Sequence, residues 1–102
     1  MIIGLLRVEF RLHGNDSLKG KRKVCSSLKQ KVANKFNVAV AEVEAMDNKE
    51  RLVLGIVTVA NQTSKVDSRL SKVQAMIEAI SPAEVVHVST EVFSDTEEAA
   101  PW

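Results

Sequence analysis

Apolar and polar residues alternate from residue 2 to residue 13. A period of two is typical of a strand with one buried face. The even positions collect Ile2, Gly4, Leu6, Val8, Phe10 and Leu12, and the odd positions collect Ile3, Leu5, Arg7, Glu9, Arg11 and His13. The pattern therefore predicts a first strand whose even-numbered side chains face the core.

The period changes to that of a helix in two later segments. The first runs from Leu18 to Phe36, with Ser17 as its expected N-cap (Asp16 or Asn15 could also serve) and Asn37 as a left-handed exit. The second follows Asn61 or Thr63 as its cap and ends at Ser81-Pro82. Their expected buried stripes are Leu18, Cys25, Leu28, Val32 and Phe36, with Val24 at the margin, and then Val66, Leu70, Val73, Ile77 and Ile80.

The sequence pattern predicts strands in three further segments. Residues 38–46 alternate poorly, which indicates a bulge or an edge position, and residues 47–50 are typical of a hairpin loop. Residues 52–60 are apolar at odd and even positions alike, so we expect a central strand covered on both faces. Residues 85–93 form the last predicted strand.

The predicted order is β-α-β-β-α-β. Right-handed crossovers then give an α+β, ferredoxin-like fold: a four-stranded antiparallel sheet, spatial order 4-1-3-2, with both helices on one face. Residues 1–93 form its single domain, and residues 94–102 are expected to be an acidic, disordered tail.

One face of this sheet would lack a cover. Ile3 and Leu5 point to it, as does half of the third strand. Exposed apolar faces usually mark partners, so we expect a homodimer through the open face, with Ile3 and Leu5 at the interface. The alternative is that a few apolar residues are tolerated on the surface.

Composition narrows the class of protein. The chain has 102 residues, 45% of them hydrophobic, and a single cysteine, which fits one cytoplasmic domain without an internal disulfide. No apolar run is long enough to cross a membrane, and the alternating start does not resemble a signal peptide. The formal net charge of +1 hides an asymmetry. Residues 1–41 carry a net +7 and residues 42–102 a net −6.

Half of the 14 lysine and arginine residues lie on the first predicted helix. Its basic residues are Lys19, Lys21, Arg22, Lys23, Lys29, Lys31 and Lys35, and no acid occurs between Ser17 and Ala41. Cations at a helix N-terminus oppose the helix dipole, and Gly20 weakens the helix further. Free N–H groups beside basic side chains can bind anions, so we expect this cluster to bind phosphate, with Lys21 reaching past the sheet end to solvent. Alternatively, the helix begins near Arg22 and the lysine-rich stretch is a loop.

Other chemistries lack their residues. Cys25 falls on the apolar stripe and, with His13 and His87, makes no spaced metal set, so no metal or cofactor is expected. Glu42 and Glu44 appear as solvated charges on one face of an edge strand. Stacking of RNA bases on the sheet is disfavoured, because Phe10 faces the helices and the third strand has no aromatic residue.

Several blocks resemble the YlxP-like proteins, a bacterial family of unknown function. They are Ser17-Leu18-Lys19-Gly20-Lys21-Arg22-Lys23-Val24, residues 35–43, Asp47, Arg51 and Leu54-Gly55. Members are typically encoded among translation and ribosome-maturation factors, so the resemblance implies a small cytoplasmic ferredoxin-like domain with a role near RNA or the ribosome. The hairpin departs from the family, because residues 45–49 lack its aromatic residue.

Three function classes remain. The first is a non-enzymatic protein associated with RNA or a ribosomal particle, which binds phosphates through the basic helix. The second is a dimeric regulatory domain that binds a small ligand. The third is an enzyme for an anionic substrate held by Arg22 and the lysines, but it lacks an evident base or nucleophile.

Overall fold

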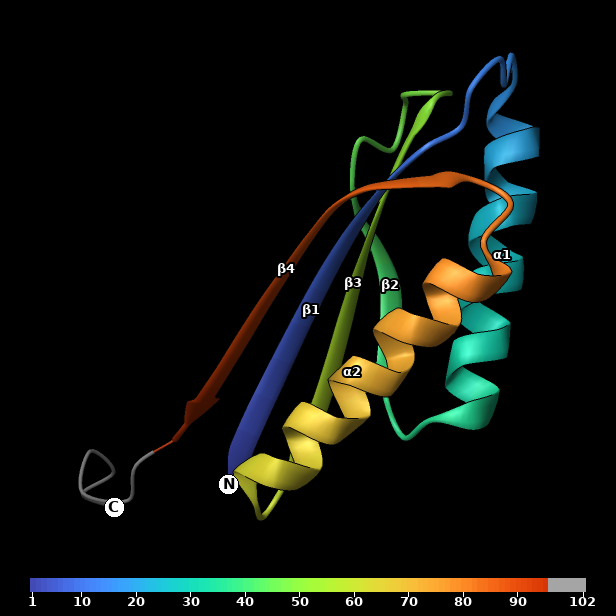
Figure 1. Ribbon diagram of the computed structural model, residues 1–102. Coiled ribbons are helices and arrows are strands. Elements are labelled where there is room, and N and C mark those ends of the chain that lie inside the picture. Colours follow the sequence, from blue (N-terminus) through green and yellow to red (C-terminus); the bar gives the residue numbers. More distant parts are fainter. Residues whose placement is uncertain (96–102) are drawn as a thin grey trace.

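The computed structural model describes residues 1–95 and has the predicted order of elements (Figure 1). The elements are β1 (Ile2–Arg11), α1 (Leu18–Lys35), β2 (Ala39–Glu44), β3 (Arg51–Ala60), α2 (Thr63–Ile80) and β4 (Glu84–Ser94). The sheet order is β2-β3-β1-β4, and all neighbouring strands are antiparallel. This is the predicted order counted from the opposite edge, so the fold class is confirmed.

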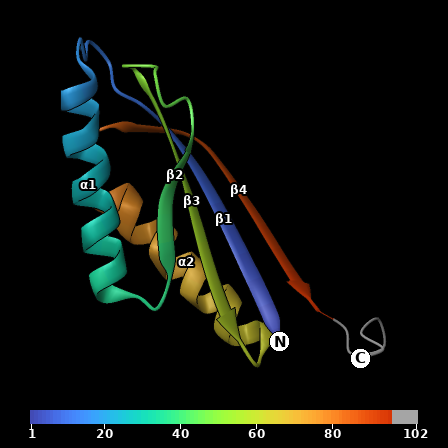
Figure 2. The same cartoon turned by 180° about the vertical axis from the view of Figure 1, so that it is seen from behind.

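The core lies between the sheet and the two helices. Helix α1 packs beside β2 and β3, and α2 lies across β1 (Figures 1 and 2). The even-numbered residues of β1 point into this layer, as the alternation predicts, and so do the even-numbered residues of β3. The buried core is Leu6, Val8, Phe10, Leu12, Cys25, Leu28, Val32, Leu52, Leu54, Ile56, Val66, Leu70, Val73 and Ile77.

The helix ends match the expectations in part. Ser17 is the N-cap of α1, and its Oγ accepts a hydrogen bond from the Gly20 amide at 3.0 Å. The predicted left-handed exit at Asn37 is wrong. Helix α1 ends at Lys35, its C-cap Phe36 has extended backbone, and the one non-glycine residue with positive φ among residues 1–95 is Ala45 (φ 58°). The cap of α2 is Gln62 rather than Asn61 or Thr63, and no side chain caps that helix.

Strand β2 is an edge strand with a bulge, as its irregular pattern indicates. Glu42 pairs with Leu54 and Glu44 with the adjacent Val53, so Val43 is the extra residue. An extra residue reverses the alternation of faces beyond it. The prediction that Glu42 and Glu44 share a face is therefore wrong: Glu42 points toward α1, and Glu44 points toward the uncovered face.

Two other expectations change at the surface. Strand β3 is central, but one of its faces has no cover within the described chain, and Val57 and Val59 are 41% and 49% exposed there. Strand β4 continues through Ser94, and Asp95 accepts a hydrogen bond from the Met1 amino group at 2.7 Å. The remainder of the predicted tail, residues 96–102, lies outside the described residues. No described helix is long and apolar enough to span a membrane.

Candidate anion-binding surface

Six basic side chains of α1 form the strongest charged feature, here called the basic ridge. They are Lys19, Arg22, Lys23, Lys29, Lys31 and Lys35, all exposed except the half-buried Lys29. None of the six forms an ion pair with a carboxylate among residues 1–95. The helix begins at Leu18, so the alternative of a lysine-rich loop is wrong. The ridge thus carries positive charge that nothing in the described protein neutralises.

Lys21 does not belong to the ridge. The expectation that it reaches solvent and binds anions is wrong, because its side chain is 1% exposed. Its Nζ donates hydrogen bonds to the carbonyl oxygens of Ala45, Met46 and Arg51 at 2.7, 3.0 and 3.3 Å. Nζ also lies 2.9 Å from Glu42 Oε2 and forms an ion pair with it, but the two groups do not have the geometry of a hydrogen bond.

The contacts of Lys21 connect the first helix to the β2–β3 hairpin. Ala45, whose carbonyl it binds, has a left-handed backbone, which is unfavourable for a residue with a side chain. An ammonium group has three donors and can satisfy several carbonyls at the mouth of such a turn. Lys21 therefore supports the hairpin and is unavailable to a ligand.

The start of α1 is built around Gly20 and Asn15. The Asn15 amide donates to the carbonyl oxygens of Ser17 and Lys49, at 2.8 and 2.5 Å. A Cβ on Gly20 would collide with Asn15 Oδ1 and lie 3.2 Å from Ser17 Oγ. The glycine that weakens the helix in isolation is thus the residue that admits its capping side chains.

A shallow groove of about 540 Å³ follows the ridge. Neutral hydrogen-bonding side chains alternate there with cations, and the lining contains no acid and no aromatic residue. Such a surface can bind anions by charge and hydrogen bonds, but it offers no aromatic ring on which bases could stack. The lining residues are Lys19, Arg22, Lys23, Ser26, Ser27, Gln30, Lys31 and Asn34.

A chain of ion pairs occupies part of the uncovered sheet face. Arg7 pairs with Glu44, and Arg51 lies 3.6 Å from Glu44 and 2.8 Å from Glu9. The hydrogen bond from the Arg51 guanidinium holds the pKa of Glu9 below its usual range, although desolvation of the carboxylate opposes this. The same contact raises the pKa of Arg51. Ile3 and Leu5, the residues predicted to face a partner, are half-buried on this face.

Residues 1–95 contain no group of three potential metal-binding side chains. Cys25 is buried in the core, and burial, followed by the nearby Glu42 charge, raises the pKa of its thiol. His13 Nε2 lies 2.6 Å from Glu84 Oε1, which accounts for one of the two histidines as a surface contact. The ridge and the uncovered sheet face therefore remain as the two candidate surfaces.

Comparison with known proteins confirms the resemblance seen in the residues. The model of a family described as "Protein of unknown function (DUF503)" matches residues 3–90. The chain is 32% identical over 92 residues to "Uncharacterized protein YlxP" of Bacillus subtilis (strain 168), a match that covers 90% of this chain and 100% of that protein.

Two solved structures are distant likenesses of this chain. A crystal structure of SnoaB, a cofactor-independent oxygenase from Streptomyces nogalater, gives a TM-score of 0.47 at 10% identity, covering 92% of both chains. The protein At3g17210 from Arabidopsis thaliana gives a TM-score of 0.48 at 7% identity, in a match that covers 92% of this chain and 95% of that one. Likenesses this remote say nothing about what the chain does.

Proposed function

This chain belongs to the DUF503 family of proteins of unknown function, and we propose that it is a non-enzymatic protein that binds the phosphates of RNA, free or in a ribosomal particle, through the basic ridge. The observation that carries the proposal is that six cations on one helix have no carboxylate partner among residues 1–95. Clustered like charges repel one another, and a polyanion relieves that repulsion while it releases its own counterions.

The chemistry of the groove favours contact with the backbone of RNA over recognition of its bases. Ser26, Ser27, Gln30 and Asn34 lie between the cations and can donate hydrogen bonds to phosphate oxygens. The groove has no aromatic side chain for stacking. Binding should therefore depend on charge and shape, with a strong dependence on salt and a weak dependence on sequence.

The length of the ridge limits the number of phosphates. From Lys19 to Lys35, α1 rises by about 24 Å at about 1.5 Å per residue. Contacts with about three to five phosphates give a logarithmic salt slope of about −2 to −3.5 for single-stranded RNA, at roughly −0.7 per phosphate.

The test is a titration of a fluorescent single-stranded RNA by anisotropy, at a series of salt concentrations. Arg22→Gln with Lys23→Gln removes two ridge cations and should flatten the slope by about 1.4 units. The matched control is Lys65→Gln with Lys72→Gln on the exposed side of α2, which changes the net charge equally. Binding in which both double variants lose the same slope would contradict a specific role of the ridge.

A further inference from the structure

The uncovered sheet face divides into an apolar half and a polar half. Pairing places Phe93, Ile3 and Val59 side by side, and Leu5 and Val57 in the next row, beside the exposed Glu91 of β4. Phe93, Val57 and Val59 are all more than 40% exposed. A row of neighbouring apolar side chains on this scale is unusual for a surface that stays in water.

The polar half is already neutralised within the chain. Two arginines, Arg7 and Arg51, pair there with two glutamates, Glu9 and Glu44. Val53, which lies between Glu9 and Glu44 in the register, is completely buried on this side of the sheet, outside the core cluster. Charges that are paired in advance can enter an interface at a lower desolvation cost than unpaired charges.

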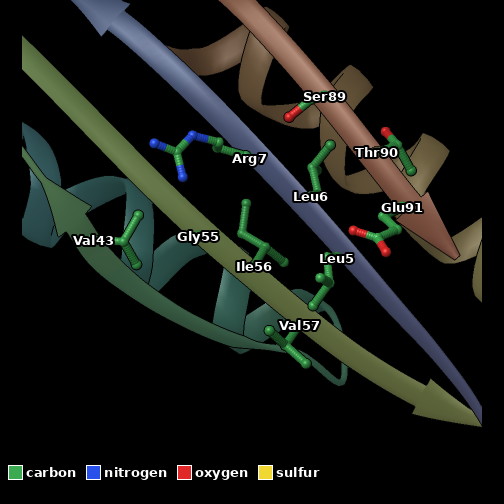
Figure 3. Close-up of a pocket in the computed structure, with 10 residues that line it drawn as sticks. All are labelled: Leu5, Leu6, Arg7, Val43, Gly55, Ile56, Val57, Ser89, Thr90 and Glu91. Atoms are coloured by element: carbon green, nitrogen blue, oxygen red, sulfur yellow. The ribbon is translucent and has the colours of Figure 1, made fainter. Parts of the chain in front are cut away.

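A hollow of about 380 Å³ separates the two halves. Figure 3 shows it between Leu5 and Val57 on the central strands, Val43 on β2 and Glu91 on β4. Gly55 leaves room at the bottom of this hollow, because a Cβ at that position would lie 2.8 Å from Val43 Cγ1. The face can therefore accept projecting side chains as well as present them.

The size of the face suits a second copy of the chain. Four strands, of which the longest span ten or eleven residues, cover roughly 600 Å² at about 3.3 Å per residue and 4.8 Å per strand. Two such faces bury roughly 1,200 Å² together, which is the lower limit for a stable interface. The apolar half alone is too small, so the neutral polar half must take part.

From these observations we propose that the uncovered sheet face is the interface of a homodimer. Charge supports this orientation. Helix α1, which carries the basic ridge, lies on the helical side of the sheet (Figures 1 and 2), so in such a dimer both sheets would separate the two ridges. The two clusters of like charge are thus kept apart on association. If the proposed function also holds, the dimer binds two segments of RNA on its opposite outer sides.

The test is the mass of the full chain by light scattering and sedimentation equilibrium, from about 1 to 100 µM. The wild type should give about twice 11.2 kDa. Val57→Glu and Val59→Glu, made singly at exposed positions, should give monomers that keep the wild-type circular dichroism spectrum. The control is Met46→Glu, an equally exposed apolar residue in the hairpin, which should stay dimeric.

The proposal is overturned by a wild type that stays monomeric at 100 µM, or by glutamate variants that remain dimers. Two variants distinguish failure of the proposed dimer from failure of the proposed function. Arg22→Gln with Lys23→Gln should remain dimeric while its salt slope falls. Val57→Glu should become monomeric while it keeps the salt slope for a short RNA that one ridge can bind.

Discussion

Replacing Lys21 by methionine tests whether this residue holds the hairpin rather than a ligand. Methionine keeps the length and apolar body of the side chain but has no donor. The change leaves three carbonyl oxygens, those of Ala45, Met46 and Arg51, without their shared donor. It also leaves Glu42, which is 19% exposed, without its cation.

The magnitude follows from these contacts. Removing one partner of a buried ion pair costs about 3–5 kcal/mol, and a hydrogen bond from a charged donor contributes about 1.5–3 kcal/mol. These effects are not additive, and water reaches part of Glu42, so the lower end applies. We expect Lys21→Met to lower the free energy of unfolding by about 3 kcal/mol, which is about 12–24 °C in Tm for a domain of this size.

The measurement is urea and thermal unfolding by circular dichroism. Lys23→Met, two residues along on the exposed side of α1, should change stability by less than about 0.5 kcal/mol. Adding Glu42→Gln to Lys21→Met should recover part of the loss, because it removes the unpaired carboxylate. A loss below about 1 kcal/mol for Lys21→Met would refute the structural role.

Two more predictions concern the helix start and the ion pairs. Gly20→Ala should lower the free energy of unfolding in urea by about 1 kcal/mol despite the better helix propensity of alanine, because the new Cβ displaces Asn15 from its two carbonyl partners. In an Asn15→Ala background the same change should stabilise the protein. Equal effects in both backgrounds would contradict this reasoning. Arg51→Met should raise the pKa of Glu9 toward its ordinary value in an NMR titration of the side-chain carboxyl. Because the pKa of Glu9 is lowered in the folded state, the contribution of Glu9 to stability is present above the ordinary carboxyl pKa and is lost as the pH falls through the pKa of the folded state. An unchanged titration of Glu9 in the variant would show that Arg51 is not the cause.

Periodicity was sufficient to predict the fold. The alternation along residues 2–13 and the helical stripes through Leu28 and Val73 identify the buried faces, and right-handed crossovers then place both helices on one side of the sheet. These signals are local, and the burial of apolar side chains that they mark is the strongest driving force for folding. The irregular pattern around Ala41–Val43 predicted a bulge or an edge position, and the strand has both.

The errors at Lys21 and Glu42 concern side chains that contact each other across a long stretch of sequence. Lys21 continues the stripe of Cys25, Leu28 and Val32 at helical spacing, which is the one sequence signal for its burial. Its partners are backbone carbonyls of the hairpin, which no side-chain pattern reveals. The orientation of Glu42 follows from the single extra residue of the bulge, and alternation cannot show which side of the bulge a residue falls on.

The burial of Lys21 also makes it a chemical reporter. Reagents that acylate amines attack side chains that water can reach, and Lys21 is 1% exposed whereas Lys19 and Lys23 on the same helix are open to solvent. Its modification therefore requires that the hairpin separate from α1. In a pulse-labelling experiment analysed by mass spectrometry, Lys19 and Lys23 serve as internal standards. The rate at which Lys21 is modified then measures how often this one local contact opens in the otherwise folded protein.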